Sequence, residues 1–153
     1  MSRNLKMEQI TNSTGLDYVL KFNKMLDEEM SPLLPDFLRP ISVNEESSAL
    51  DSFWQDILSG KNSFALLAWA DGKPVGMALI EEEKVCHLES LIVLSEYRRQ
   101  GIGKALIERA KQMAAERGNR IMTLNVLPEN KSAKQLYGNT GFSDFRTMMA
   151  IEL

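Results

Sequence analysis

Cysteine and histidine are almost absent from this chain of 153 residues, which contains only Cys86 and His87. A disulfide within the chain requires two cysteines, so none can form. A structural zinc site takes four Cys or His ligands, so we expect no metal site. Scarcity of cysteine is typical of proteins in reducing compartments, and we expect a cytoplasmic location.

Long apolar runs are also missing. The longest of them, such as Ala65–Ala70, fall far short of the ~20 residues that a helix needs to cross a bilayer, so we expect no membrane span. Residues 1–10 contain Arg3, Lys6 and Glu8 and no apolar stretch, so we expect no signal peptide there.

A basic excess is missing too, since 18 Lys and Arg are balanced against 21 Asp and Glu, for a net charge of −3. Proteins that bind nucleic acid usually carry basic surfaces, so we expect no nucleic-acid partner. The charge is unevenly divided along the chain. Residues 1–84 contain 8 basic and 14 acidic residues, whereas residues 85–153 contain 10 basic and 7 acidic. The second part therefore suits an anionic ligand and the first a cationic one.

The chain does have the composition of one folded domain, with 44% hydrophobic and 25% charged residues, and we expect a single domain over residues 1–153. Its apolar spacing predicts an α/β (α+β) fold with helices flanking one central sheet, in the order β-α-α-β-β-β-α-β-α-β. Asp71-Gly72 predicts a hairpin, and Asn44 is a suitable cap for the second helix. The strands are expected at residues 5–11, 63–70, 74–82, 85–94, 120–127 and 142–153, and the helices at residues 16–30, 44–60, 101–117 and 130–141.

Two glycines, Gly101 and Gly103, lie where a predicted strand leads into the best-defined helix. Without a Cβ they let an anion approach the backbone, and the free N–H groups of the first helical turn attract it. Arg98, Arg99 and Lys104 add full positive charges. The pattern indicates a cradle for a phosphate or pyrophosphate. The alternative is a tight turn from strand to helix with solvated arginines nearby.

Two common phosphate-binding motifs do not fit this loop. A dinucleotide fingerprint requires a third glycine where the chain has Leu106, and an acidic residue where it has Asn125 and Val126. A P-loop requires Ser or Thr after its Gly-Lys pair, but Ala105 follows Lys104. A nucleotide-binding domain is therefore disfavoured.

The loop is similar to a motif of the GNAT N-acetyltransferase superfamily, in which Arg/Gln-x-x-Gly-x-Gly/Ala binds the pyrophosphate of acetyl-CoA; here it reads Arg98-x-x-Gly101-x-Gly103. A second block, Asn-x-x-Ala-x-x-Leu-Tyr-x-x-x-Gly-Phe from Asn130 to Phe142, also resembles that family. The resemblance covers residues 63–153. It implies a mixed, mostly antiparallel twisted sheet, N-acetyltransferase activity with acetyl-CoA as co-substrate, direct attack by the amine, and often a homodimer.

The same resemblance implies which residues bind acetyl-CoA. The main chain of one strand would contact the pantetheine arm, the glycine loop the pyrophosphate, and the last helix the sulfur. Asn130 is also a suitable N-cap for that helix, and both roles can hold together. The implied residues are Leu91, Ile92, Val93, Arg98, Arg99, Gln100, Gly101, Ile102, Gly103, Lys104, Asn130 and Tyr137.

Acetyl transfer to an amine needs a general base, because an alkyl amine is mostly protonated at neutral pH. His87 and Glu89 lie two residues apart in a predicted strand, so we expect them on one face, which Leu91 and Val93 continue. Glu89 is the first candidate, because a charged residue is unexpected in a buried strand, and His87 is the second. Alternatively, both side chains are solvated at the end of the strand.

A general acid for the leaving thiolate is the role that the resemblance implies for Tyr137, whose usual pKa of about 10 keeps it protonated at neutral pH. Tyr137 also shares a helical face with Ala133, Leu136 and Thr140, so it could instead be a core residue. Cys86 is expected in the core.

The acceptor is expected to bind to the first 60 residues and the loops near Glu89, with the loop Ser31–Ile41 as one wall. Trp54 is expected in the core, and Trp69 either there or in the acceptor pocket. An acyl-CoA-binding regulatory module without catalysis remains the alternative function. Several carboxylates could attract a cationic amine or simply form a solvated face, namely Asp27, Glu28, Glu29 and Glu81–Glu83.

Overall fold

The structure, a computed structural model, describes residues 4–39 and 47–153. Asn44, the predicted cap of the second helix, lies outside the described residues. The elements are β1 (Leu5–Gln9), α1 (Ser13–Met30), the 3-10 helices η1 (Ser31–Leu33) and η2 (Asp36–Leu38), α2 (Ser47–Ser59), β2 (Ser63–Ala70), β3 (Lys73–Glu81), β4 (Cys86–Val93), the 3-10 helix η4 (Ser95–Tyr97), α3 (Ile102–Glu116), β5 (Met122–Leu124) and α4 (Lys131–Asn139).

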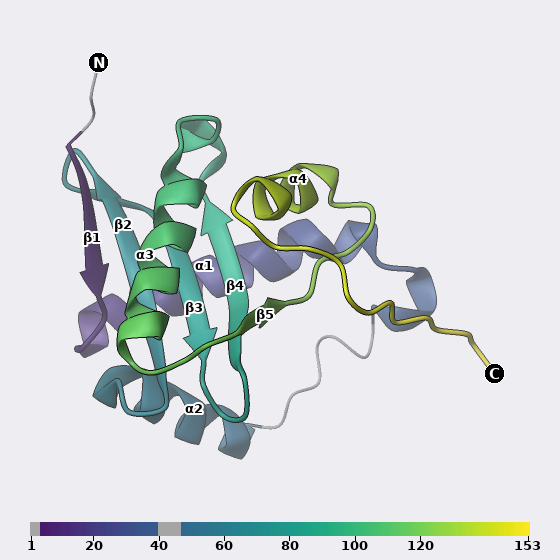
Figure 1. The fold of residues 1–153 in the computed structure, drawn as a ribbon, viewed down its shortest axis with the longest axis horizontal. Helices are drawn as coiled ribbons and strands as arrows, with labels where there is room; N and C mark the ends of the chain where they lie inside the picture. The colour runs from purple at the N-terminus through teal and green to yellow at the C-terminus, as the bar shows by residue number, and fades with distance from the viewer. Residues whose placement is uncertain (1–3, 40–46) are drawn as a thin grey trace.

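The strands form one sheet in the order β1-β2-β3-β4-β5 (Figure 1). The pairs from β1 to β4 are antiparallel and β4 pairs with β5 in parallel, so the predicted mixed, mostly antiparallel sheet is confirmed. β2 and β3 are joined through Asp71 and Gly72, whose φ angles of 52° and 79° suit a tight hairpin turn. The hairpin predicted from these two residues is therefore confirmed.

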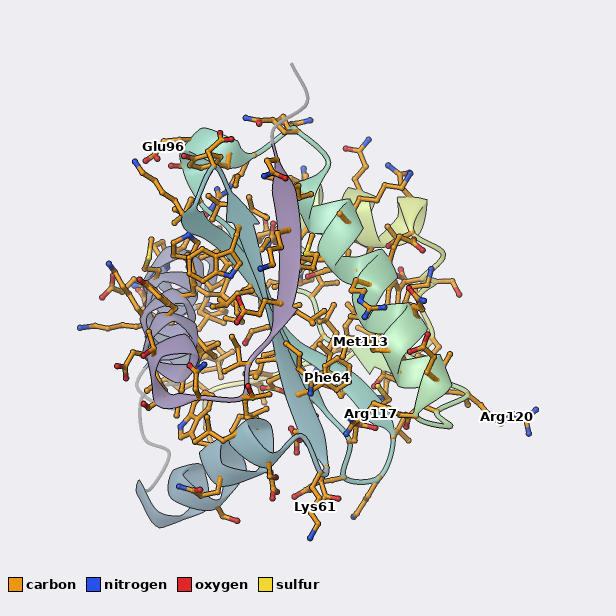
Figure 2. The ribbon with its side chains drawn as sticks, turned by 90° about the vertical axis from the view of Figure 1, so that its left-hand side faces the viewer. Lys61, Phe64, Glu96, Met113, Arg117 and Arg120 are labelled. Atoms are coloured by element: carbon orange, nitrogen blue, oxygen red, sulfur yellow. The ribbon has the colours of Figure 1, made fainter. Side chains whose placement is uncertain are left out.

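Helices cover both faces of this sheet (Figures 1 and 2). On one face, Phe22 of α1 and Ile57 of α2 pack into a cluster with Leu67 of β2. On the other face, α3 packs Leu106 into a second cluster with Phe64 of β2. Because both faces are covered, β2 and β3 are apolar along most of their length rather than alternating. Among the described residues, no helix is long and apolar enough to cross a bilayer.

The prediction of a last strand at residues 142–153 is wrong, because no strand forms there. Residues 143–153 are exposed throughout, and none of their backbone groups bonds to another backbone group in the described part of the chain. The apolar alternation is present, but a strand forms only where a neighbouring strand supplies hydrogen-bond partners. The strand expected at residues 120–127 is shorter than predicted, because β5 has only three residues.

Candidate active site

A cavity of about 1270 Å³ lies where α1, α2, β3, β4, α4 and the loop before α3 meet. Segments from both ends of the chain line it, so the fold brings the two oppositely charged parts of the sequence to one place. Its volume exceeds the ~300–1,000 Å³ of an ordinary small-molecule pocket. The cavity therefore has room for more than one small ligand.

The glycine loop forms one end of this cavity. Gly101 precedes α3 with a left-handed φ of 81°, which a residue with a Cβ adopts only under strain. A Cβ on Gly103 would lie 3.1 Å from Cδ2 of Leu136, so this glycine lets α4 approach α3 closely. No side chain caps α3, and the N–H groups of its first turn remain available to an anion.

The predicted residues of the loop do not all face the cavity. Arg98, Arg99, Gly101, Ile102, Gly103 and Lys104 line it. Gln100 is not among the lining residues; its side-chain amide donates to the carbonyl of Glu96 at 3.4 Å. The exposed Arg99 and Lys104 leave two cationic groups at the N-terminus of α3.

Arg98 is held by two partners in this structure. Its Nε donates to the carbonyl of Val93 at 2.8 Å, and its Nη2 donates to Oε2 of Glu29 at 2.7 Å. Glu29 lies in the last turn of α1 and also lines the cavity. Arg98 therefore ties the glycine loop to both β4 and α1.

Strand β4 supplies main chain along the cavity. β5 pairs only with the first three residues of β4, up to Leu88, and beyond them the described residues provide a strand neighbour only on the β3 side. Antiparallel pairing leaves every second residue of β4 with its N–H and C=O directed away from β3. Leu91, Ile92 and Val93, the residues predicted to contact a pantetheine arm, all line the cavity.

Glu89 lies at a β-bulge in β4. Ser90 pairs with Leu79 and Leu88 pairs with Ile80, so Glu89 is the extra residue without a cross-strand partner. Leu88 and Leu91, three residues apart, consequently pack against the same core cluster. The expectation that Leu91 continues the face of Glu89 is wrong, because a bulge reverses the alternation that follows it.

His87 and Glu89 do lie together, with Nε2 of His87 3.8 Å from Oε2 of Glu89. The other ring nitrogen of His87, Nδ1, lies 2.7 Å from Oγ1 of Thr123, its neighbour on β5. Glu89 lines the cavity, but His87 is not among the lining residues. The geometry therefore places Glu89, and not His87, on the wall of the cavity. Thr123 had no distinguishing mark in the sequence, because only the parallel pairing brings it to His87.

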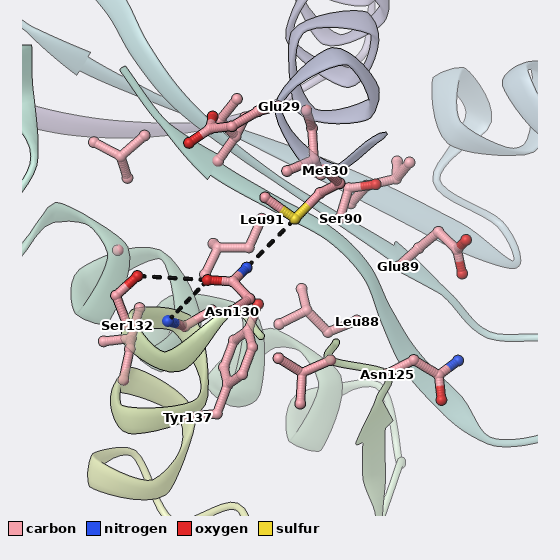
Figure 3. A pocket seen from close by; sticks show the side chains of 18 of the residues that line it. Glu29, Met30, Leu88, Glu89, Ser90, Leu91, Asn125, Asn130, Ser132 and Tyr137 are labelled. Atoms are coloured by element: carbon pink, nitrogen blue, oxygen red, sulfur yellow. Dashed lines mark hydrogen bonds between the residues drawn. The ribbon is translucent and has the colours of Figure 1, made fainter. Parts of the chain in front are cut away.

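Tyr137 lines the cavity from α4, and Figure 3 shows its ring rising toward β4 near Asn130 and Leu88. Its ring meets that of Phe142 edge to face, with centroids 5.9 Å apart. Burial raises the pKa of the Tyr137 phenol above its usual value, so the hydroxyl stays protonated at neutral pH. Tyr137 thus packs in the structure and also faces the cavity.

Asn130 caps α4, as its position predicts. Its Oδ1 accepts hydrogen bonds from the N–H of Ala133 at 3.3 Å and the hydroxyl of Ser132 at 3.4 Å. Its Nδ2 donates to the sulfur of Met30 at 3.4 Å, which connects α4 to the end of α1 (Figure 3). The side chain also lines the cavity.

The other end of the cavity is acidic and aromatic. Asp27, Glu81 and Glu83 line it, whereas Glu28 and Glu82 do not. Instead, Glu82 accepts a hydrogen bond from Arg117 at 2.6 Å. The aromatic residues at this end are Phe53 and Trp54, whose rings meet edge to face with centroids 4.9 Å apart.

The two tryptophans lie in different environments. Trp54, expected in the core, packs against the core cluster of α1 and α2 and also lines the cavity. Trp69 is not among the lining residues; it meets Tyr18 edge to face at 5.7 Å, and its Nε1 is buried without a hydrogen-bond partner among the described residues. Trp69 therefore lies in the core, which was one of its two predicted positions, and not in the cavity.

Cys86 is buried in the core, as predicted, and is not among the lining residues. Burial, together with the nearby charge of Glu82 and partly offset by Arg117, raises the pKa of its thiol to about 11. A thiol with so high a pKa is a poor nucleophile at neutral pH. Among the described residues, no group of three or more His, Cys, Asp or Glu could hold a metal ion.

A comparison with known proteins identifies relatives of this chain. An uncharacterized N-acetyltransferase of Methanocaldococcus jannaschii is 38% identical over 82 residues, which are 48% of this chain and 36% of that protein. N-alpha-acetyltransferase 60 of Xenopus tropicalis is 31% identical over 116 residues, covering 60% of this chain and 48% of that protein. The chain thus covers less than half the length of these two curated relatives.

Solved structures share the fold. A complex of the aminoglycoside N-acetyltransferase AAC(6')-Iy with CoA superimposes with a TM-score of 0.70 at 21% sequence identity, covering 100% of this chain and 97% of that one. The family model described as "Acetyltransferase (GNAT) family" matches residues 24–142, a span that includes the glycine loop and the block from Asn130 to Phe142. Because this match extends over well more than half of the sequence, the chain belongs to the GNAT acetyltransferase family.

Proposed function

We propose that this chain is an acetyl-CoA-dependent N-acetyltransferase that acts as a single domain and transfers the acetyl group directly to a primary amine of a small molecule or peptide. The proposal includes a cytoplasmic location, a homodimer, and catalysis without a metal. The observation that carries it is the continuous cavity, which joins an uncapped, cationic helix N-terminus to an acidic and aromatic end.

Acetyl-CoA fits the glycine-loop end of this cavity. The N–H groups at the start of α3, with Arg99 and Lys104, would bind the pyrophosphate. The main chain of Leu91–Val93 would bind the pantetheine arm by strand-like hydrogen bonds, since this part of β4 has no strand beyond it in the described chain. The thioester would then lie between Tyr137 and Glu89, which line the same cavity.

Glu89 is the proposed general base. The amine nitrogen attacks the thioester carbonyl once it has lost a proton, and the Glu89 carboxylate takes that proton directly or through water. Because of the bulge, Glu89 has no cross-strand partner in β3. Bulges commonly direct a side chain into a site. His87, whose Nε2 lies 3.8 Å from Oε2 of Glu89, is the second candidate for the general base.

Tyr137 is the proposed general acid. When the bond from the carbonyl carbon to sulfur breaks, the CoA thiolate takes the phenol proton. The raised pKa of Tyr137 keeps that proton in place before the reaction at neutral pH. Main-chain N–H groups of β4 are proposed to stabilise the negative charge that develops on the carbonyl oxygen.

The acceptor is proposed to be cationic. The proteins compared above have different names, an aminoglycoside N-acetyltransferase in one case and an N-alpha-acetyltransferase in another, so these names do not specify the acceptor of this chain. Support comes from the cavity itself, where Asp27, Glu81 and Glu83 would attract ammonium groups and Trp54 offers an aromatic face.

The experiment is an initial-rate assay of CoA thiol release with a panel of polyamines, aminoglycosides, amino acids and peptides. Direct transfer in a ternary complex predicts intersecting double-reciprocal lines when both substrates are varied. Parallel lines would indicate an acetyl-enzyme instead. Tight CoA binding without transfer to any amine would favour a regulatory acyl-CoA-binding module.

A further inference from the structure

A polar pair joins α1 to β4 at the wall of the cavity. The hydroxyl of Ser90 donates to Oδ1 of Asn23 at 2.9 Å, and both residues line the cavity. Ser90 is only 8% exposed, and it lies on the sheet face where Leu79, its partner on β3, and Ile92 pack into the apolar cluster under α1. Burying a polar group there costs free energy that an apolar residue would avoid, so packing does not explain the pair.

Ser90 differs from the other polar side chains that are buried in the described part of the chain. Those are Ser63 and Thr140, whose hydroxyls donate to backbone carbonyls one to four positions away. The Ser90 hydroxyl instead reaches a side chain 67 positions away, on another element. It therefore fixes the position of the Asn23 amide relative to β4.

The nitrogen of the Asn23 amide remains available to a ligand. Oδ1 accepts the hydrogen bond from Ser90, whereas Nδ2 carries two N–H donors that meet no acceptor among residues 4–39 and 47–153. Asn23 is half-buried and lines the cavity. An N–H donor binds the lone pair of an oxygen and does not bind an ammonium group. This point of the wall therefore suits a neutral oxygen, unlike the carboxylates of the cavity.

Asn23 lies close to groups proposed to attract the amine. Residues three, four and seven positions apart share one face of a helix, and such a set from α1 lines the cavity. The set is Asn23, Leu26, Asp27 and Met30. Ser90, which holds the amide, directly follows Glu89, and Figure 3 shows both side chains on β4. An amine drawn to Asp27 or Glu89 would therefore bring an oxygen on a neighbouring carbon close to Asn23.

We propose that Asn23 is a specificity-determining residue whose amide N–H groups bind an oxygen of the acceptor close to its reacting nitrogen, with Ser90 as a positioning residue. This inference rests on the proposed acetyl transfer and narrows its acceptor. The acceptor is a primary amine with a carbonyl or hydroxyl oxygen on the neighbouring carbon. Peptide N-termini and amino sugars have that arrangement, whereas plain alkyl polyamines lack it.

The test is a calorimetric titration of the CoA-saturated chain with two matched pairs of amines. One pair is alaninamide and sec-butylamine, and the other is trans-2-aminocyclohexanol and cyclohexylamine; only the first member of each pair has the oxygen. Asn23→Asp keeps an oxygen for Ser90 but loses both N–H donors, and Asn23→Leu loses them without adding charge. Asn139→Asp is the matched control, because it adds the same charge to the cavity wall from α4.

The quantity compared is the affinity ratio within each pair, in which the effect of an added charge on two monocations cancels. We expect both Asn23 variants to lower this ratio roughly three- to tenfold for at least one pair, as expected for one net hydrogen bond, and Asn139→Asp to leave it unchanged. The pair that responds identifies the oxygen as a carbonyl or a hydroxyl. A ratio that the Asn23 variants leave unchanged in both pairs, or a wild type that binds none of the four amines, would overturn the inference.

Replacing CoA by acetyl-CoA separates this inference from the proposed function. Acetylation of amines with no dependence of the ratio on Asn23 would overturn the inference and leave the function standing. A ratio that depends on Asn23 in the CoA complex, without transfer from acetyl-CoA, would support the Asn23 subsite and contradict the function.

Discussion

The guanidinium of Arg98 and the carboxylate of Glu29 form an ion pair of 2.7 Å that joins the glycine loop to the end of α1. Both side chains remain about 40% exposed, at 42% and 40%, so the pair contributes little to folding stability. Its consequence concerns binding. Arg98 belongs to the motif proposed to bind pyrophosphate, and in this pair its positive charge is taken up by Glu29. The Glu29 carboxylate would also repel an anion that approaches Arg98.

Glu29→Gln is therefore expected to strengthen acetyl-CoA binding. Removing the competing charge should lower the KM for acetyl-CoA by roughly two- to fivefold, in line with the ~0.5–1 kcal/mol of an exposed ion pair, with kcat unchanged. Glu28→Gln is the matched control, since Glu28 is the adjacent carboxylate and is not among the lining residues. A raised KM for Glu29→Gln would show that Glu29 holds Arg98 in its binding position instead.

Gly101→Ala should damage the anion site through the backbone. At a φ of 81° a Cβ costs roughly 1–2 kcal/mol, so the start of α3 should shift and CoA binding should weaken by about tenfold or more. Gly138→Ala provides the control, because a Cβ there meets nothing within 4 Å and the residue is helical. Calorimetric titration with CoA measures both, and equal affinity of the two variants would contradict the assignment.

Glu89→Gln should remove the group that accepts the amine proton. The acidic limb of the kcat/KM profile should disappear, and kcat should fall by roughly 100-fold or more. Glu83→Gln, which changes another carboxylate lining the same cavity, should affect the KM for a cationic amine more than kcat. If the acidic limb survives in Glu89→Gln, the proton passes to His87 or to bulk water.

Tyr137→Phe should lower kcat by roughly 100-fold and change the affinity for CoA little, because the ring still packs against Phe142. Because the pKa of Tyr137 is raised, its phenol keeps the proton to a higher pH than a free tyrosine does. Ionisation of Tyr137 should therefore cause no loss of rate between pH 7 and about 10, the usual pKa of a tyrosine. A parallel loss of kcat and CoA affinity would mean that the hydroxyl serves packing only.

The sequence allowed the glycine loop, the Asn130 cap and the hairpin to be predicted because each depends on residues close together in the chain. The Glu89 bulge could not be predicted in this way, since a bulge depends on the register between β3 and β4. The contact of Arg98 with Glu29 joins residues 69 positions apart, and only the packing of α1 brings them together.

The error at residues 142–153 has a different cause. Apolar alternation indicates what a strand would bury, but it does not indicate whether the segment lies beside a strand with which it can pair. Trp54 shows a similar limit, because an apolar helical stripe predicts burial and does not distinguish a core from the wall of a cavity.

Direct transfer, as we propose it, brings acetyl-CoA and an amine together in one cavity. Its most direct test is to incubate the protein with acetyl-CoA and a cationic amine and to quantify free CoA and acetylated amine in the same samples. We predict that CoA release depends on the amine and that the two products appear in equal amounts. CoA release that is independent of the amine, or CoA binding without any acetylated product across the panel, would contradict the claim.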